Sequence, residues 1–258
     1  MAETVAQTAT LDDAPLLAVR NLTKRFAALV ALDDLSFEVR RAEIFGIAGP
    51  NGAGKTTLLN VCTGTLAPTS GQVLLDGERV EGQPPHRLCH KGLARTFQIP
   101  RLFASMSIYE NVATGAMFGI GSKPTDGRSR SDLVDEALEV TGLRSRADMP
   151  AANADLLARK MTMLAAALVT RPKVVFMDEP LAGLTPEEID RFVALIASLH
   201  ERLNITFLVI EHKVRALAQL CDRIMIMHHG SRICLDTPER ALRDPQVIEV
   251  YLGAEYFA

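Results

Sequence analysis

Apolar and polar positions repeat along the chain with two different periods. The runs EIFGIAG, KVVFMDE and ITFLVIEH are apolar almost throughout, which is typical of strands buried on both faces of a parallel sheet. TPEEIDRFVALIASLHERLN instead carries its apolar residues at helical spacing. Its start, with Thr185, Pro186 and Glu188, has the pattern that caps a helix at the N-terminus. Buried strands that alternate with amphipathic helices predict an α/β fold.

Other segments depart from this alternation. LLAVRNLTKRF and LDDLSFEVRR predict short strands around a turn, and RIMIMHHGSRICLD predicts a hairpin. From about residue 100 to residue 170 the pattern is helical, in YENVATGAM, SDLVDEALEVTGL and LLARKMTMLAAALV. The segment between the first two, GIGSKPTDGRSR, is rich in glycine, serine and charge and predicts a loop. An antiparallel β part and an inserted helical block are therefore expected beside the α/β core.

Composition and net charge limit the classes of protein to which the chain can belong. The chain has 258 residues, 48% of them hydrophobic, which is enough for one large domain. A net charge of −3 gives no basic footprint, so we expect no nucleic-acid partner. The apolar segment LAAALV is far shorter than the roughly 18 residues that a membrane span needs. The 4 cysteines have no C-x-x-C spacing and are expected to be buried, reduced thiols. Residues 1–14 lack the charged and apolar regions of a secretory signal and are expected to form a disordered tail.

The segment GPNGAGKT, Gly49 to Thr56, follows an apolar strand and opens a predicted helix. It matches the phosphate-loop pattern G-x-x-x-x-G-K-[ST] in the context that this motif requires. The glycines let backbone N–H groups surround phosphates, and the helix N-terminus adds positive potential. Lys55 is expected to reach the β- and γ-phosphates of ATP, and Thr56 to bind Mg²⁺. The predicted nucleotide-binding residues here are Gly49, Asn51, Gly52, Gly54, Lys55, Thr56 and Thr57.

Two acids end the strand KVVFMDE. Asp178 is placed to bind Mg²⁺ directly or through water, and Glu179 to act as the base that polarises an attacking water. An ordinary acidic strand end before a proline turn is the alternative.

Three further residues join this candidate site. Gln98 lies where the core gives way to the helical block, and it can contact Mg²⁺ and water; alone it would be a surface glutamine. His212 follows ITFLVIE and can bond the γ-phosphate and orient Glu179, although histidines at strand ends are more often structural. Phe26 is a candidate to stack on adenine, with core packing as the alternative. His228 and His229 lie in a predicted turn and receive no role.

These motifs predict a fold and its divisions. We expect an α/β P-loop NTPase (RecA-like) core with an antiparallel β subdomain and an inserted α-helical subdomain. Residues 15–258 would form one ATP-binding domain. Its nucleotide-binding core would comprise 15–99 and 171–258, and its helical subdomain 100–170.

The order GPNGAGKTT, RTFQIPRLF, VVFMDEP, LAGLTPEE, VIEH resembles the ATP-binding subunit of an ABC transporter, from Leu16 nearly to the end of the chain. ARTFQIPRLFASMSIYENV and the ending DPQVIEVYLG resemble the subgroup that powers uptake of branched-chain and other hydrophobic amino acids. The ATPase of lipopolysaccharide export matches less well around the glutamine.

The resemblance implies partners and a location. Two ATP-binding subunits would dimerise head to tail around two ATP molecules, with Leu181–Leu184 crossing the interface. Transmembrane permease subunits would dock near Gln98, against Phe97, Leu102 and Phe103, unless these are core residues. A periplasmic or extracellular solute-binding protein would act indirectly. The chain would be cytoplasmic and peripheral on the inner face of the cell membrane.

One segment departs from the family pattern. Each ATP would lie between one subunit's phosphate loop and the other's signature segment, a serine- and glycine-rich turn that opens a helix. That segment falls near Ala154–Ala158, where no serine or glycine occurs, and Asp155 would place a carboxylate near a phosphate. We expect Arg159 and Lys160 to point outward. This departure would affect the ATP at the partner's phosphate loop and not the ATP at this chain's own loop, so it favours an asymmetric heterodimer. The alternative is that the subgroup tolerates a loose signature segment.

Other functions remain open from the residues alone. A nucleotide-binding regulatory subunit with little turnover would also fit. A non-transport ABC protein of DNA repair or translation would need a coiled-coil insertion or tandem cassettes, and neither is present. A small-molecule kinase would not need the Asp178–Glu179 pair.

Overall fold

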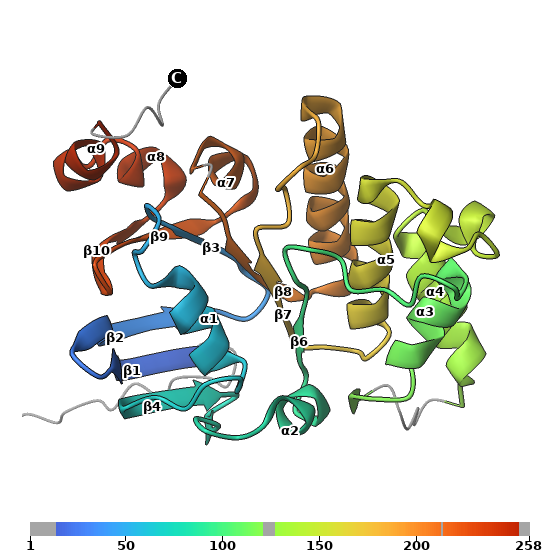
Figure 1. The fold of residues 1–258 in the computed structure, drawn as a ribbon, viewed down its shortest axis with the longest axis horizontal. Helices are drawn as coiled ribbons and strands as arrows, with labels where there is room; N and C mark the ends of the chain where they lie inside the picture. Colours follow the sequence, from blue (N-terminus) through green and yellow to red (C-terminus); the bar gives the residue numbers. More distant parts are fainter. Residues whose placement is uncertain (1–13, 121–126, 213, 253–258) are drawn as a thin grey trace, which may run out of the picture.

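The computed structural model describes residues 14–120, 127–212 and 214–252 (Figure 1). The tail predicted at residues 1–14 lies outside this range except for Ala14. Two sheets and a block of helices make up the fold (Figure 1). In the described residues, no helix is both long enough and apolar enough to cross a membrane.

The larger sheet has six strands in the order β10-β9-β3-β8-β7-β6. Five strands, β3, β6, β7, β8 and β9, run parallel to one another, and β10 pairs antiparallel with β9. Phe45 and Ile47 of β3 face one layer of core, whereas Ile44 and Ala48 face the other, because successive side chains of a strand point to opposite faces. The bounds are β3 Ile44–Ala48, β6 Leu93–Arg95, β7 Val174–Asp178, β8 Thr206–Ile210, β9 Arg223–His228 and β10 Ser231–Asp236.

The smaller sheet is antiparallel, in the order β2-β1-β4-β5. Its apolar face and α1 cover one face of the larger sheet, as Phe37 stacked on Phe45 illustrates (ring centroids 5.6 Å apart). The bounds are β1 Leu17–Phe26, β2 Leu29–Val39, β4 Ser70–Leu75, β5 Glu78–Arg79 and α1 Lys55–Cys62.

Helices cover the other face of the larger sheet. The apolar stripe of α6 packs there through Phe192, Ile196 and Leu199, and the predicted capping box of Thr185 and Glu188 is present at its start. The bounds are α6 Pro186–Leu203, α7 Val214–Leu220, α8 Pro238–Ala241 and α9 Pro245–Leu252. Helix α2, Pro85–His90, lies on the side of the smaller sheet, where its Leu88 joins the core layer of Phe45 and Ile47.

The helical block comprises α3 Ile108–Gly115, α4 Arg130–Val140 and α5 Leu156–Leu168, with the 3-10 turns Arg144–Arg146 and Ala151–Asn153 (Figure 1). It has a core of its own that includes Ile108, Leu138 and Ala165. Helix α5 also packs against the larger sheet through Leu164 and Leu168. The predicted fold class is therefore confirmed, and α5 is the element that joins the block to the rest.

Candidate active site

The phosphate-loop segment connects β3 to α1 and depends on its glycines. Gly49 and Gly54 have φ of +154° and +98°, values that residues with a Cβ rarely adopt. A Cβ at Gly49 would lie 2.2 Å from the Met227 carbonyl oxygen, and one at Gly54 would lie 2.4 Å from that of Ala31. Gly54 caps α1 without a side-chain hydrogen bond, so the start of this helix offers backbone N–H groups to an anion.

Lys55 lies across this loop rather than in solvent. Its ammonium donates to the carbonyl oxygens of Gly49 (2.6 Å) and Pro50 (3.0 Å), and the residue is 7% exposed. Burial lowers the pKa of Lys55, while the carboxylates of Glu179 and Asp178 oppose that shift. The Lys55 ammonium is thus held against the loop backbone, in the electrostatic field of both acids.

Glu179 is the point at which three predicted residues meet. Its backbone is left-handed, with φ of 44°, directly after β7. Its carboxylate accepts a hydrogen bond of 2.6 Å from the Gln98 amide nitrogen. His212 Nδ1 lies 3.8 Å from the same carboxylate oxygen. Left-handed backbone is unfavourable for glutamate, and such strain gathers at functional sites.

Asp178 has a partner that its sequence context did not indicate. The guanidinium of Arg95, on β6, donates to the Asp178 carboxylate at 3.1 Å, to Asn60 of α1 and to Thr63, the residue that caps the end of α1. Both members of the ion pair are about 15% exposed or less. Arg95 therefore fixes Asp178 relative to the helix that carries the phosphate loop.

We expect Arg95→Met to lower the free energy of unfolding by about 1–3 kcal/mol, because Asp178, Asn60 and Thr63 lose a charged donor. Urea denaturation measures this loss. Arg101→Met is the control, because Arg101 lies over the same Phe97 ring as Arg95 (5.0 and 4.9 Å) but is exposed. Equal losses from the two variants would contradict a special role for the Asp178 pair.

Lys160 corrects the expectation that it points outward. It is 2% exposed, and its ammonium donates to the Gln98 backbone carbonyl at 3.2 Å. Burial lowers its pKa, and Glu211 and Glu179 oppose that shift. The reason is that α5 is covered on two faces, by the sheet and by the helical block, which leaves no solvent side at this position.

Glu211 is a second buried charge that the sequence reading left without a role. One oxygen accepts from the Leu181 backbone N–H at 2.8 Å, and burial raises the pKa of this carboxyl group. The other oxygen lies 3.8 Å from His212 Nδ1. Glu211 thus connects the segment Leu181–Leu184 to His212.

A pocket of about 360 Å³ lies above the phosphate loop. Phe26 is 43% exposed at its edge, with the Lys24 ammonium 5.0 Å from the ring centre. His229 also lines this pocket, although the sequence reading gave it no role. The predicted residues that line it are Phe26, Asn51, Gly52, Gly54, Lys55, Thr56, Thr57 and Glu179. Four predicted residues do not line this pocket, namely Gly49, Gln98, Asp178 and His212. Gln98 and His212 lie beside its lining residue Glu179, and Asp178 directly precedes Glu179 in the chain.

Comparisons with known proteins agree with this geometry. Residues 32–182 match the model of the ABC transporter family. The chain belongs to the ABC transporter family. The high-affinity branched-chain amino acid transport ATP-binding protein LivG of Salmonella typhimurium is 38% identical, over 93% of this chain and 98% of LivG. BraF of Pseudomonas aeruginosa, which carries the same description, is 36% identical over the same shares.

A more distant relative and a solved structure complete the comparison. The lipopolysaccharide export system ATP-binding protein LptB of Haemophilus influenzae is 30% identical over 93% of this chain and 98% of LptB. The crystal structure of the ADP conformation of MJ1267, an ATP-binding cassette of an ABC transporter, has a TM-score of 0.84 and 30% identity, and covers 93% of this chain and 99% of MJ1267. The predicted family and subgroup resemblance are confirmed. This ABC cassette binds nucleotide and is an ATPase of the transport-coupled class.

Proposed function

We propose that this cassette hydrolyses ATP to drive uptake of branched-chain amino acids through separate permease subunits. The observation that carries the proposal is the meeting of Gln98, His212 and Glu179 beside a phosphate loop spanned by Lys55. The names of LivG and BraF support the solute class.

The residues suit the steps of phosphoryl transfer to water. Glu179 would polarise the attacking water, with Gln98 holding one carboxylate oxygen and His212 beside it. Lys55 would exchange its loop carbonyls for phosphate oxygens and stabilise their negative charge. Phe26 would stack on the adenine at the pocket edge.

The donors at this site also suit Mg²⁺. The ion favours oxygen ligands and keeps few protein ligands when it binds nucleotide phosphates. Thr56, Asp178 and Gln98 supply a hydroxyl, a carboxylate and an amide oxygen, and they would hold the ion. Within the described ranges, no group of three or more His, Cys, Asp or Glu residues could hold a metal alone, so the phosphates would complete the coordination.

A groove of about 330 Å³ beside Gln98 supports the permease partner. Arg95, Phe97, Arg101 and Met163 are among its lining residues. Phe97 is 36% exposed and Phe103 59% exposed, which would be costly for surfaces that stay in water. A permease helix would dock here, so the cassette would lie at the inner face of the membrane.

The start of α5 supports the asymmetric pair. Asp155 caps α5 by accepting from the Ala158 N–H at 2.7 Å and pairs with Arg146 at 3.0 Å. The bond from Ala158 and the Arg146 guanidinium hold the pKa of Asp155 below its usual value, so the carboxylate stays charged. A partner's ATP would meet this charge, whereas the site on this chain's own loop would be completed by the partner's signature.

We expect Asp155→Ser to raise ATP turnover of the isolated chain by about 10- to 100-fold, because serine keeps the helix cap and restores a hydroxyl for the γ-phosphate. A phosphate-release assay checks this. Asp155→Asn is the control, since it keeps the cap and removes only the charge. Robust turnover by the unmodified isolated chain, with no gain in Asp155→Ser, would contradict the asymmetric pair.

His229 extends the predicted nucleotide contacts. It lies in the turn between β9 and β10 with φ of 47°, and the next residue, Gly230, donates to the Ala53 carbonyl at 3.0 Å. Asparagine tolerates this backbone. We expect His229→Asn to weaken ATP binding by about 2- to 10-fold, the worth of one hydrogen bond. Isothermal titration calorimetry measures the affinity, with His86→Asn as the control because His86 is exposed and does not line the pocket. Equal affinities would remove His229 from the site.

Uptake of radiolabelled L-leucine tests the whole proposal. Cells that lack their own system would receive this cassette with its co-purifying permease and second cassette. Uptake that depends on Glu179 supports the importer. Uptake that persists with Glu179→Gln would favour the regulatory subunit, and lipopolysaccharide export without amino acid uptake would favour the other transport class.

A further inference from the structure

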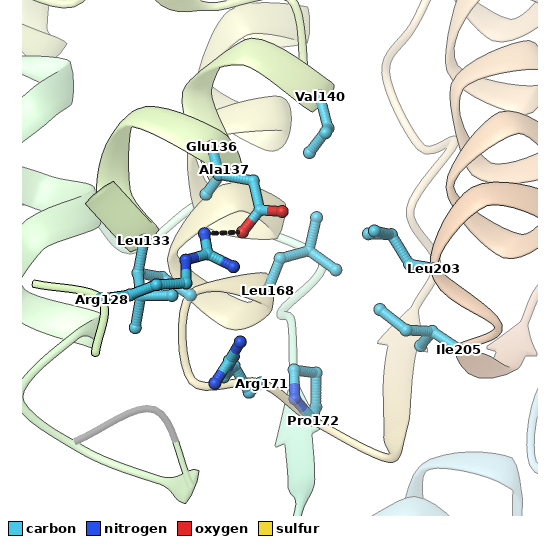
Figure 2. A pocket seen from close by; sticks show the side chains of 11 residues that line it. Arg128, Leu133, Glu136, Ala137, Val140, Leu168, Arg171, Pro172, Leu203 and Ile205 are labelled. Atoms are coloured by element: carbon cyan, nitrogen blue, oxygen red, sulfur yellow. Dashed lines mark hydrogen bonds and ion pairs between the residues drawn. The ribbon is translucent and has the colours of Figure 1, made fainter. Parts of the chain in front are cut away.

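A pocket of about 250 Å³ lies where the helical block meets the rest of the cassette (Figure 2). We call it the seam pocket. Its walls come from α4 and the end of α5 on one side, and on the other from the end of α6 and from Ile205, which directly precedes β8. None of the residues that line the nucleotide pocket lines it. The function proposed above therefore leaves the seam pocket without a role.

Much of the seam pocket is apolar. Leu168, Leu203, Ile205 and Val140 line it, and Leu168 and Ile205 are 7% and 8% exposed. Figure 2 shows Leu203 and Ile205 on one side, across from α4. Apolar cavities of about 150 Å³ already admit benzene, so the seam pocket has room for a branched aliphatic group.

Charged groups occupy the opposite side. Arg128 and Glu136 form an ion pair and are 32% and 46% exposed. The bond from Arg128 uses one of the two Glu136 carboxylate oxygens. Figure 2 places Arg171 on the same side as Arg128. The pocket thus combines two guanidinium groups, one carboxylate and an aliphatic wall.

The backbone at Arg171 is unusual for its residue type. Its φ is 55°, in the left-handed region where helices commonly end on glycine. Pro172 follows, and a proline restricts the residue before it further. Strain of this kind points to a role for the side chain that it positions. That side chain lines the seam pocket.

These groups match the three parts of an aliphatic α-amino acid. Guanidinium groups recognise a carboxylate with paired hydrogen bonds. The Glu136 carboxylate suits an ammonium group, and the wall of Leu168, Leu203 and Ile205 suits a branched hydrocarbon side chain. We propose that the seam pocket binds a free aliphatic L-amino acid. The bound molecule would bridge α4 to α6 and hold the helical block against the core.

Calorimetry on the full chain with L-leucine and L-valine tests this. We expect saturable binding of one molecule per chain. Glu136→Gln and Arg171→Asn should each weaken it by about 10- to 100-fold, the worth of a charged hydrogen bond. Asparagine at position 171 tolerates the left-handed backbone, so this variant should fold. Asp135→Asn is the matched control, because Asp135 lies next to Glu136 on α4 but does not line the pocket, and the change breaks only its exposed ion pair with Arg144 (2.7 Å).

Ligand variants separate free amino acids from the carboxyl end of a peptide, which would share the carboxylate and the side chain. N-acetyl-L-leucine and 4-methylpentanoate lack the ammonium group and should bind at least about 10-fold more weakly than L-leucine. Equal binding of N-acetyl-L-leucine would overturn the proposal in favour of a peptide end. No binding of L-leucine at millimolar concentration, or binding unchanged in both pocket variants, would also overturn it. The solute class coincides with that proposed for transport, but this test uses the isolated chain, so failure here leaves the uptake proposal standing.

Discussion

Glu179→Gln is expected to lower ATP hydrolysis by about 100- to 10,000-fold, the usual contribution of a general base. Glutamine keeps an oxygen that can accept from Gln98 but cannot take a proton from water. The geometry around His212 should survive because the side chains have the same size. A phosphate-release assay on the assembled cassette pair measures the loss.

A control variant and a measurement of ATP affinity test whether the loss is specific to the chemical step. Glu187→Gln is the matched control, because Glu187 lies exposed in the first turn of α6 on the same segment of chain. ATP affinity should be retained in Glu179→Gln, since the phosphate loop is unchanged. Turnover within about 3-fold of the unmodified protein would remove Glu179 from the role of base, because the loss would then be worth well under 1 kcal/mol.

Lys55→Met is expected to weaken ATP binding by about 10- to 100-fold or more, because the phosphates lose a charged donor. Methionine fills the space of the lysine stem, but Gly49 and Pro50 also lose the donor to their carbonyl oxygens. Titration with a fluorescent ATP analogue checks the change in affinity. The two variants separate binding from chemistry, since one should lose affinity and the other turnover.

Lys91→Met is the control for this loss of charge. Lys91 forms an exposed ion pair with Glu78 at a distance from the loop. Its replacement should leave ATP affinity unchanged. A Lys55→Met protein that binds ATP normally would mean that the phosphates lie elsewhere.

Local patterns sufficed for the parts of the site that lie within one segment. The phosphate loop, the acids at the end of β7 and the cap of α6 each follow from a few adjacent residues, and the structure places Gln98 and Glu179 in contact. The fold class followed from strand and helix periods. The division into subdomains at residues 100 and 170 and the roles of the site residues stay predictions.

Contacts between distant segments could not be read in the same way. Lys160 looked exposed because charged residues usually are, but α5 is covered on two faces. His229 was recognisable as part of a turn, yet its place at the nucleotide pocket depends on how the hairpin packs on Ala53. The adjacent arginine-proline pair at residues 171–172 gave no local sign of a second pocket. Contacts between segments that are distant in the sequence, rather than the local spacing of apolar residues, determine where these side chains lie.

The bond from Lys160 to the Gln98 carbonyl has a mechanical consequence. A tilt of α5 that broke this hydrogen bond would leave the buried Lys160 ammonium group without its Gln98 acceptor, which costs free energy. The Gln98 side chain in turn donates a hydrogen bond to the Glu179 carboxylate. These two hydrogen bonds link α5 of the helical block to the Glu179 carboxylate, so a displacement of α5 by a docked permease would be transmitted to the proposed catalytic base.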